Sequence, residues 1–302
     1  MNSTRRMIVS TALAAAGIGI AVPAAAQAPA NDPNPGNLTL TGSFDVVSTY
    51  MFRGIRQHST GVALWPAADL GIAVYSSDKG GLRSAGVNTG TWNSLHTGDT
   101  GSDGPSGKLW YESDFYAALG LGFDKGVSFT TTYTAYTSPN NSYSTVKEIM
   151  FKLALDDSGY LHKAAVKPYV IVAREFNAEA DGLTNGQADA GQNAGTYLEV
   201  GGAPGYSGSK ASVAFPIKAG FSLSNYYELN VGTSAVPAYV DNKFGFFSIA
   251  GIATVPLGGT TGFGAWNVHG GVEYQALGET TKAFNGGDSS RVIGSVGIGF
   301  TY

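Results

Sequence analysis

The sequence contains no cysteine and few charged residues, and both shortages narrow the class of protein. Without cysteine, the chain can form neither a disulfide bond nor a thiolate metal site. Only 13% of the residues are charged, which is about half the share in an average soluble domain. Acidic residues (22) outnumber basic residues (18), so the charge balance gives no indication of a nucleic-acid partner.

Long apolar runs are also missing from the chain after its N-terminal segment. No stretch there reaches the roughly 18 apolar residues that a membrane-spanning helix requires. The N-terminal segment has the pattern of a secretory signal peptide, with basic residues Arg5 and Arg6, an apolar run from Met7 and small residues near Ala26. The sequence therefore predicts a cleaved signal peptide over residues 1–26, a periplasmic N-terminal tail over 27–37 and the folded part over 38–302.

Strand periodicity fills the rest of the chain. About twelve segments alternate apolar and polar residues with the two-residue period of a β-strand, and clusters of Gly, Asn, Asp and Ser separate them. Connections after odd-numbered segments tend to be long and those after even-numbered segments short, as in membrane barrels. The pattern predicts an all-β fold: a transmembrane up-and-down antiparallel β-barrel of 12 strands, counted to within two, with both termini periplasmic. A soluble sandwich has no reason to sort its loops in this way.

The alternation also predicts which side chains face lipid. In the first segment we expect Phe44, Tyr50 and Phe52 on the lipid face and Asp45 and Arg53 on the inner face. In the fourth segment we expect Leu109, Tyr111 and Phe115 outside, with Lys108, Trp110, Glu112 and Asp114 inside. The third, eighth and tenth segments do not show a clean face.

The chain ends on "RVIGSVGIGFTY", in which apolar residues occupy every second position up to a final aromatic. This ending resembles the C-terminal strand of bacterial outer-membrane β-barrel proteins. The resemblance implies an outer-membrane location in contact with lipid and lipopolysaccharide. It also implies recognition by the barrel assembly machinery, with Val296, Ile298, Phe300 and Tyr302 as the assembly signal.

A narrower resemblance lies near the start of the predicted barrel. The stretch "DVVSTYMFRGIRQ", followed by a strand and "AGVNTGTWNS", is similar to a proteobacterial family of uncharacterised outer-membrane proteins known as Gcw_chp. Tyr50, Phe52, Arg53, Gly54 and Ile55 carry the family's Tyr-x-Phe-Arg-Gly-Ile motif. The resemblance supports the fold and the location but implies no settled activity.

The sequence offers little that is typical of an enzyme. His269 and Glu273 share the inner face of one predicted strand, but four residues of strand separate them by roughly 13 Å, too far for a hydrogen bond. The acidic residues Glu179, Asp181 and Asp189 of a long loop lack the order of a calcium-binding EF-hand. We therefore predict no catalytic residue, no metal and no cofactor. An outer-membrane lipid hydrolase remains a remote alternative, although no convincing Ser–His pair is present.

Transport is the remaining function for such a barrel. Twelve tilted strands give a backbone diameter of about 24 Å, and side chains from opposite walls leave roughly 12 Å of it free. The sequence thus predicts a narrow, porin-like diffusion channel for small polar solutes. The alternative is a non-conducting structural or surface-interaction barrel that uses its long extracellular loops.

Acidic residues slightly outnumber basic ones among the expected pore-lining positions, which predicts a weak preference for cations. Arg53 and Arg291 are expected to lie together at the outer mouth. The predicted pore-lining residues are Asp45, Arg53, Trp65, Asp69, Lys108, Trp110, Glu112, Asp114, Glu148, Lys152, Lys167, Glu175, Glu199, Lys218, His269, Glu273 and Arg291.

Overall fold

The computed structural model describes residues 36–302, except residues 59, 99–107, 177–193, 234, 259–261 and 263. The predicted signal peptide, nearly all of the predicted tail and the acidic loop residues Glu179, Asp181 and Asp189 lie outside the described residues. Within the described ranges, no helix is long and apolar enough to span a membrane.

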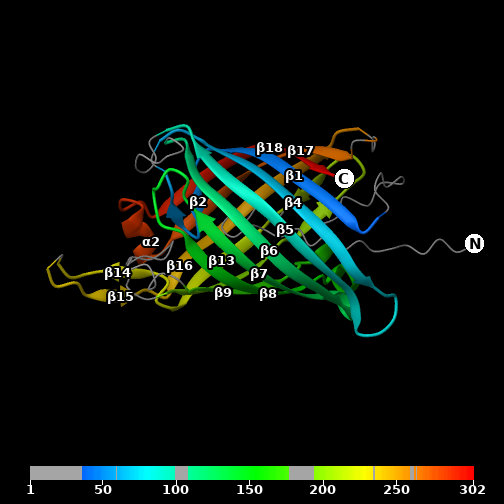
Figure 1. The fold of residues 1–302 in the computed structure, drawn as a ribbon, viewed down its shortest axis with the longest axis horizontal. Helices are drawn as coiled ribbons and strands as arrows, with labels where there is room; N and C mark the ends of the chain where they lie inside the picture. Colours follow the sequence, from blue (N-terminus) through cyan, green and yellow to red (C-terminus); the bar gives the residue numbers. More distant parts are fainter. Residues whose placement is uncertain are drawn as a thin grey trace, which may run out of the picture.

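The wall of the molecule is a closed barrel of twelve antiparallel strands (Figure 1). Each strand pairs with its neighbours along the chain. The wall consists of β1 (Leu38–Val47), β4 (Ala63–Ser76), β5 (Leu82–His96), β6 (Trp110–Phe123), β7 (Val127–Thr137), β8 (Val146–Leu155), β9 (Tyr169–Glu175), β10 (Thr196–Gly202) continued by β11 (Gly205–Ser207), β12 (Ser212–Ala214) continued by β13 (Ile217–Ser224), β16 (Phe244–Pro256), β17 (Ala265–Leu277) and β18 (Ser290–Thr301).

First and last strands close this wall. β1 pairs with β18 in the register Val46↔Val296, and Leu40 and Tyr302 exchange two backbone hydrogen bonds of 2.7 Å. Closure leaves the wall without an unpaired sheet edge, which a membrane requires because lipid offers no hydrogen-bond partners. The sequence-based prediction of the 12-strand antiparallel barrel is therefore confirmed.

Apolar side chains cover the outside of the wall. On β18 the exposed fractions are 61% for Val292 and 54% for Val296, and Phe115 on β6 is 57% exposed. Phe300 lies over Gly42 of β1, where an added Cβ would clash with its ring, and its ring centroid is 5.1 Å from that of Trp266. This apolar outer surface is the one that a lipid bilayer covers.

The two ends of the barrel differ. Both ends of the described chain lie at one end, which we call the terminal end (Figure 1). The opposite end, which we call the loop end, carries a projecting hairpin of β14 (Glu228–Asn230) and β15 (Tyr239–Asp241) and the helix α2 (Glu279–Phe284). Connections at the terminal end include the 3₁₀ turn Asp124–Gly126, the short helix α1 (Ser158–Leu161) and the 3₁₀ turn His162–Ala164.

One short segment leaves the wall and enters the barrel. β1 ends at Val47, and the chain then forms a hairpin of β2 (Met51–Phe52) and β3 (Ile55–Arg56) before β4 begins. We call residues 48–58 the inner hairpin. Tyr50 and Phe52 are completely buried in it, so the prediction that they face lipid on the first strand was wrong. The physical reason is that the chain leaves the wall after Val47, so the residues that follow pack inside the barrel.

Three other predicted inner positions also lie elsewhere. Trp110 is exposed and donates a hydrogen bond to Asn93 (3.2 Å), while Tyr111 is buried. An irregularity in the β5–β6 register at Leu95 exchanges their faces. Lys108 and Lys167 are exposed residues that precede β6 and β9 rather than lie on them.

Candidate functional site: a hairpin inside the barrel

The inner hairpin turns through two residues, Arg53 and Gly54, whose φ angles are +46° and +85°. Positive φ at both central positions defines a type I′ hairpin turn. Glycine suits the second position because a Cβ there would lie 3.0 Å from the Cβ of Phe246. Arg53 is a non-glycine residue in the left-handed region, which costs of the order of 1–3 kcal/mol and persists only where the surroundings impose it.

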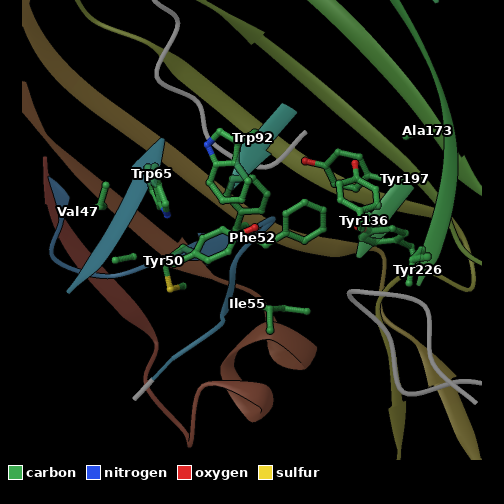
Figure 2. Close-up of a cluster of buried hydrophobic side chains, with 14 of the residues drawn as sticks. Val47, Tyr50, Phe52, Ile55, Trp65, Trp92, Tyr136, Ala173, Tyr197 and Tyr226 are labelled. Carbon is green, nitrogen blue, oxygen red and sulfur yellow. The ribbon is translucent and has the colours of Figure 1, made fainter. Parts of the chain in front are cut away.

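Aromatic side chains from several wall strands surround the hairpin (Figure 2). The ring of Tyr50 makes edge contacts with Trp65 and Trp92, each at a centroid distance of 5.4 Å. Phe52 makes an edge contact with Tyr136 at 5.7 Å. Because these side chains are buried, the hairpin and the inward-facing wall form a packed hydrophobic core inside the loop end of the barrel.

A buried ion pair between Arg53 and Glu148 binds the tip of the hairpin to the wall. Both terminal nitrogens of Arg53 donate to the carboxylate of Glu148 on β8, at 2.6 and 2.9 Å, and Nη1 also donates to the hydroxyl of Tyr226 at 2.7 Å. Tyr136 donates to the same carboxylate at 3.1 Å. The side chains of Arg53 and Glu148 are only 3% and 1% exposed, so this bidentate ion pair is sheltered from water and salt.

Aromatic faces complete the pocket around the guanidinium. The Arg53 Cζ lies 4.2 Å from the centroid of Tyr197, 4.9 Å from that of Phe52 and 5.3 Å from that of Tyr226. Contacts at these distances are within the range of cation–π attraction. We call the side chains of Glu148, Tyr136, Tyr197 and Tyr226 the Arg53 pocket.

Glu148 is not the only buried carboxyl group near this pocket. Glu175 on β9 is the cross-strand partner of Glu148. Glu112 and Asp114 on β6 share a side-chain hydrogen bond, and Asp114 lies within electrostatic range of Glu148. All four are at most 1% exposed. We call Glu112, Asp114, Glu148 and Glu175 the buried acid cluster. The described residues contain no group of three acidic or histidine side chains arranged to hold a metal ion.

The backbone of the hairpin tip is bound by residues that follow the wall strands at the loop end. The Tyr227 hydroxyl donates to the Arg53 carbonyl at 2.9 Å. Asn285, which caps α2, donates from its side chain to the Gly54 carbonyl at 2.8 Å and accepts from the Arg56 amide at 2.9 Å. Thr280 links α2 to the base of the β14–β15 hairpin by donating to the Tyr227 carbonyl at 2.8 Å. The outer structures at the loop end therefore hold the inner hairpin in place.

His58 ends the inner hairpin and contacts a second histidine. The Tyr50 amide donates to His58 Nδ1 at 3.4 Å, and the rings of His58 and His96 are 4.7 Å apart. Burial lowers the pKa of His58. A hydrogen bond with the Gly61 backbone raises this pKa in part, and the charge of the nearby Arg56 lowers it. The folded hairpin thus favours the neutral form of this histidine.

Polar side chains line the barrel between the hairpin and the terminal end. Asp69 accepts from Asn88 and Tyr116 at 2.7 and 2.9 Å. Glu199 accepts from Tyr169 and Tyr197, at 2.8 and 2.7 Å. The inward-facing lysines contact aromatic rings: Lys152 lies 4.7 Å from the ring of Tyr169 and Lys218 lies 5.5 Å from that of Phe246.

His269 binds Asp45 rather than Glu273. Its Nε2 is 2.7 Å from Asp45 Oδ1, and its Nδ1 is 2.9 Å from Asn267 Oδ1. Gly297 is on β18, which lies between β1 and β17, and any larger residue there would collide with both Asp45 and His269. Glu273 instead accepts from Ser248 and Gln275, at 2.5 and 2.9 Å.

The structure brings together some of the predicted pore-lining residues and separates others. Asp45, Trp65, Asp69, Glu112, Asp114, Glu148, Lys152, Glu175, Glu199, Lys218, His269 and Glu273 lie on the inner face of the wall. Arg53 is inside the barrel but on the hairpin. Arg291 binds Asp288 at 2.6 Å, and Arg56 approaches the same carboxylate at 3.9 Å. The predicted pairing of Arg53 with Arg291 at the mouth was therefore wrong.

Sequence reasoning missed the residues that hold the hairpin from the loops. Tyr226 and Tyr227 come just before one of the predicted long loops, and Asn285 lies within another. The signal was present in "SNYYELN", because two adjacent tyrosines are unusual in an exposed loop. Both tyrosines are completely buried.

The fold and this site define a class: a membrane-type β-barrel whose lumen is occupied at one end by a segment of its own chain. No protein-family model matches the chain, and no curated protein matches it. Similar solved structures include an outer membrane channel from Pseudomonas putida F1 (TM-score 0.47, 10% identity, covering 92% of this chain and 99% of that one). Another is the NanC porin, with a TM-score of 0.40 and 13% identity, covering 87% of this chain and 98% of that one. A third is outer membrane phospholipase A from Escherichia coli, with a TM-score of 0.42 and 10% identity, covering 86% of this chain and 92% of that one. These likenesses concern the barrel architecture alone, and the resemblance to the Gcw_chp family stays a prediction.

Proposed function

We propose that this protein is an outer-membrane channel for small polar solutes, closed at its loop end by the inner hairpin and opened when the hairpin moves. In this proposal the terminal end faces the periplasm. The observation that carries it is the way the lumen is closed. A short hairpin with a two-residue ladder fills the loop end, and a strained arginine bound to a buried carboxylate anchors it.

The surroundings of the hairpin support a gate rather than a permanent seal. A permanent seal needs only apolar packing, because a buried ion pair adds little net stability over apolar side chains of the same volume. Here polar and charged side chains continue along the inner wall toward the terminal end, from Asp69 and Glu199 to Asp45. Moving the hairpin would connect this polar lining with the loop end.

Current through the refolded protein in a planar bilayer tests the proposal. We expect long closed periods with brief openings, and a KCl gradient should give a reversal potential of cation-selective sign. The preference for cations should be stronger than the weak preference predicted from the sequence, because two of the expected basic residues, Lys108 and Lys167, are not on the inner face. An anion-selective reversal potential would contradict this assignment of faces.

A second candidate is a non-conducting barrel that binds a partner through its outer loops. The β14–β15 hairpin projects from the loop end (Figure 1), and the valines on it are unusually exposed: 60% for Val231, 71% for Val236 and 45% for Val240. Complete absence of current at every voltage, from protein that still shifts in mobility on heating in SDS, would favour this candidate.

Acid should favour the open state through His58. The folded hairpin lowers the pKa of His58, so its full contribution to stability is present above the unfolded pKa of about 6.5 and falls as the pH drops below that value. Protonation also places a charge beside His96 and Arg56. We expect more frequent openings near pH 5 than near pH 7.

His58→Asn is the variant that checks this pH dependence. Asparagine keeps an acceptor for the Tyr50 amide but does not titrate, so the response to acid should shrink. His162→Asn, at the exposed terminal end, is the control and should respond as the wild type does. An unchanged acid response in His58→Asn would assign the effect to another group.

A further inference from the structure

We propose that the Arg53 pocket is a binding site for small organic cations that carry a guanidinium group, and that such cations open the barrel by replacing the Arg53 side chain. The inference rests on the proposed channel function and names its solute class. In the structure the site is occupied from within the chain, by the end of the Arg53 side chain.

The contacts of the pocket are made to the guanidinium group itself. Glu148 receives two parallel hydrogen bonds from it, the Tyr226 hydroxyl receives a third, and the Tyr197 ring lies 4.2 Å from its carbon. The paired geometry with a carboxylate is specific to a planar fork of N–H donors. A free guanidinium could form each of these contacts, because none of them involves the hairpin backbone.

Charge favours a cation in the pocket once Arg53 leaves. Glu148 is buried, and its counter-ion in the structure is Arg53. Asp114, whose Oδ1 has no hydrogen-bond partner among the described residues, lies within electrostatic range of Glu148. A buried carboxylate that loses its counter-ion is unfavourable, so it binds another cation or takes up a proton. Glu148 therefore favours a positively charged occupant over a neutral one.

Backbone strain gives a free ligand an advantage over Arg53. Arg53 binds Glu148 with its φ at +46°, a conformation that non-glycine residues rarely adopt. A ligand that diffuses into the pocket carries no such strain.

Methylguanidinium and N-methylurea are a matched pair of probes, since they have nearly the same shape but only the first is charged. On the wild-type protein in a bilayer, millimolar methylguanidinium should raise the frequency of openings by about tenfold, and N-methylurea should not. Equal effects of the two compounds, or no effect of either on a protein that does open, would overturn the inference and leave the channel function standing.

The Arg53→Ala variant tests binding to the pocket separately from the opening of the barrel. In this variant we expect methylguanidinium to occupy the vacated pocket without raising the frequency of openings, because Arg53 no longer closes the barrel, and to raise the temperature at which the folded band is lost on an SDS gel. Adding Glu148→Gln should remove the shift in temperature. If Arg53→Ala carries no current, the channel function fails, and the shift in unfolding temperature alone decides the binding site: no shift, or the same shift with N-methylurea, would refute it.

Discussion

Replacing Arg53 by alanine is expected to convert a mostly closed barrel into a mostly open one. The change removes the bidentate bonds to Glu148 and the bond to Tyr226 but leaves alanine in the same left-handed conformation. Removing one partner of a buried ion pair costs about 3–5 kcal/mol, which corresponds to about two to four orders of magnitude in the ratio of open to closed states. Single-channel recording measures that ratio directly.

Arg56→Ala is the matched control on the same hairpin. Arg56 is 3.9 Å from Asp288, and its side chain is 27% exposed; exposed ion pairs of this kind contribute at most about 1 kcal/mol. The control should therefore open little more often than the wild type. Equal opening of Arg53→Ala and Arg56→Ala would show that the buried ion pair does not hold the gate.

Replacing Phe300 by aspartate is expected to prevent assembly of most of the protein. Phe300 lies on the outer face, over Gly42 and beside Trp266. Aspartate there loses this packing and places a charge against lipid, although near the bilayer interface that charge costs only about 1 kcal/mol. We therefore attribute the larger effect to the proposed role of the last strand as the assembly signal. The amount of heat-modifiable protein in outer-membrane fractions measures the outcome.

Thr301→Asp makes the equal change at the next residue. Thr301 is exposed at the terminal end and points to the other side of the strand. This variant should assemble nearly as well as the wild type. Normal assembly of Phe300→Asp, or equal failure of both variants, would remove the reading of Phe300 and Tyr302 as parts of the signal.

The wall of the barrel could be predicted from the sequence because lipid imposes the same pattern on every strand. Alternation such as that of Phe115, Ala117 and Leu119 on one face of β6 fixes both the strand and its facing. The pattern weakens only where the register is irregular. At Trp110 the alternation was extended through the irregularity in the β5–β6 register, and the predicted face was reversed as a result.

The closed lumen could not be predicted, because the inner hairpin imitates the wall. Tyr50 and Phe52 continue the alternation of β1 after a single polar position at Ser48, yet they pack against aromatic side chains rather than against lipid. A buried protein core and a bilayer select the same apolar residues, so periodicity cannot distinguish them. The type I′ turn was also hidden, since arginine is not one of the residues that favour it.

The buried acid cluster shows where long-range structure was needed. Glu112, Asp114, Glu148 and Glu175 were all predicted to face inward, but the sequence does not say that a positively charged side chain from residue 53 lies among them. That pairing joins residues 95 positions apart in the chain. Only the three-dimensional arrangement shows that the Arg53 guanidinium binds the Glu148 carboxylate.

The most direct test of the central claim, that residues 48–58 close the barrel, is the conductance of a variant in which Met51–Arg56 is replaced by two glycines. Both β2 and β3 are then absent, while the twelve wall strands are unchanged, and a mobility shift on heating in SDS verifies that the barrel has folded. If the hairpin is the gate, this variant carries a steady current that does not depend on voltage. A folded variant that remains as closed as the wild type would show that wall side chains fill the lumen, and would contradict the account.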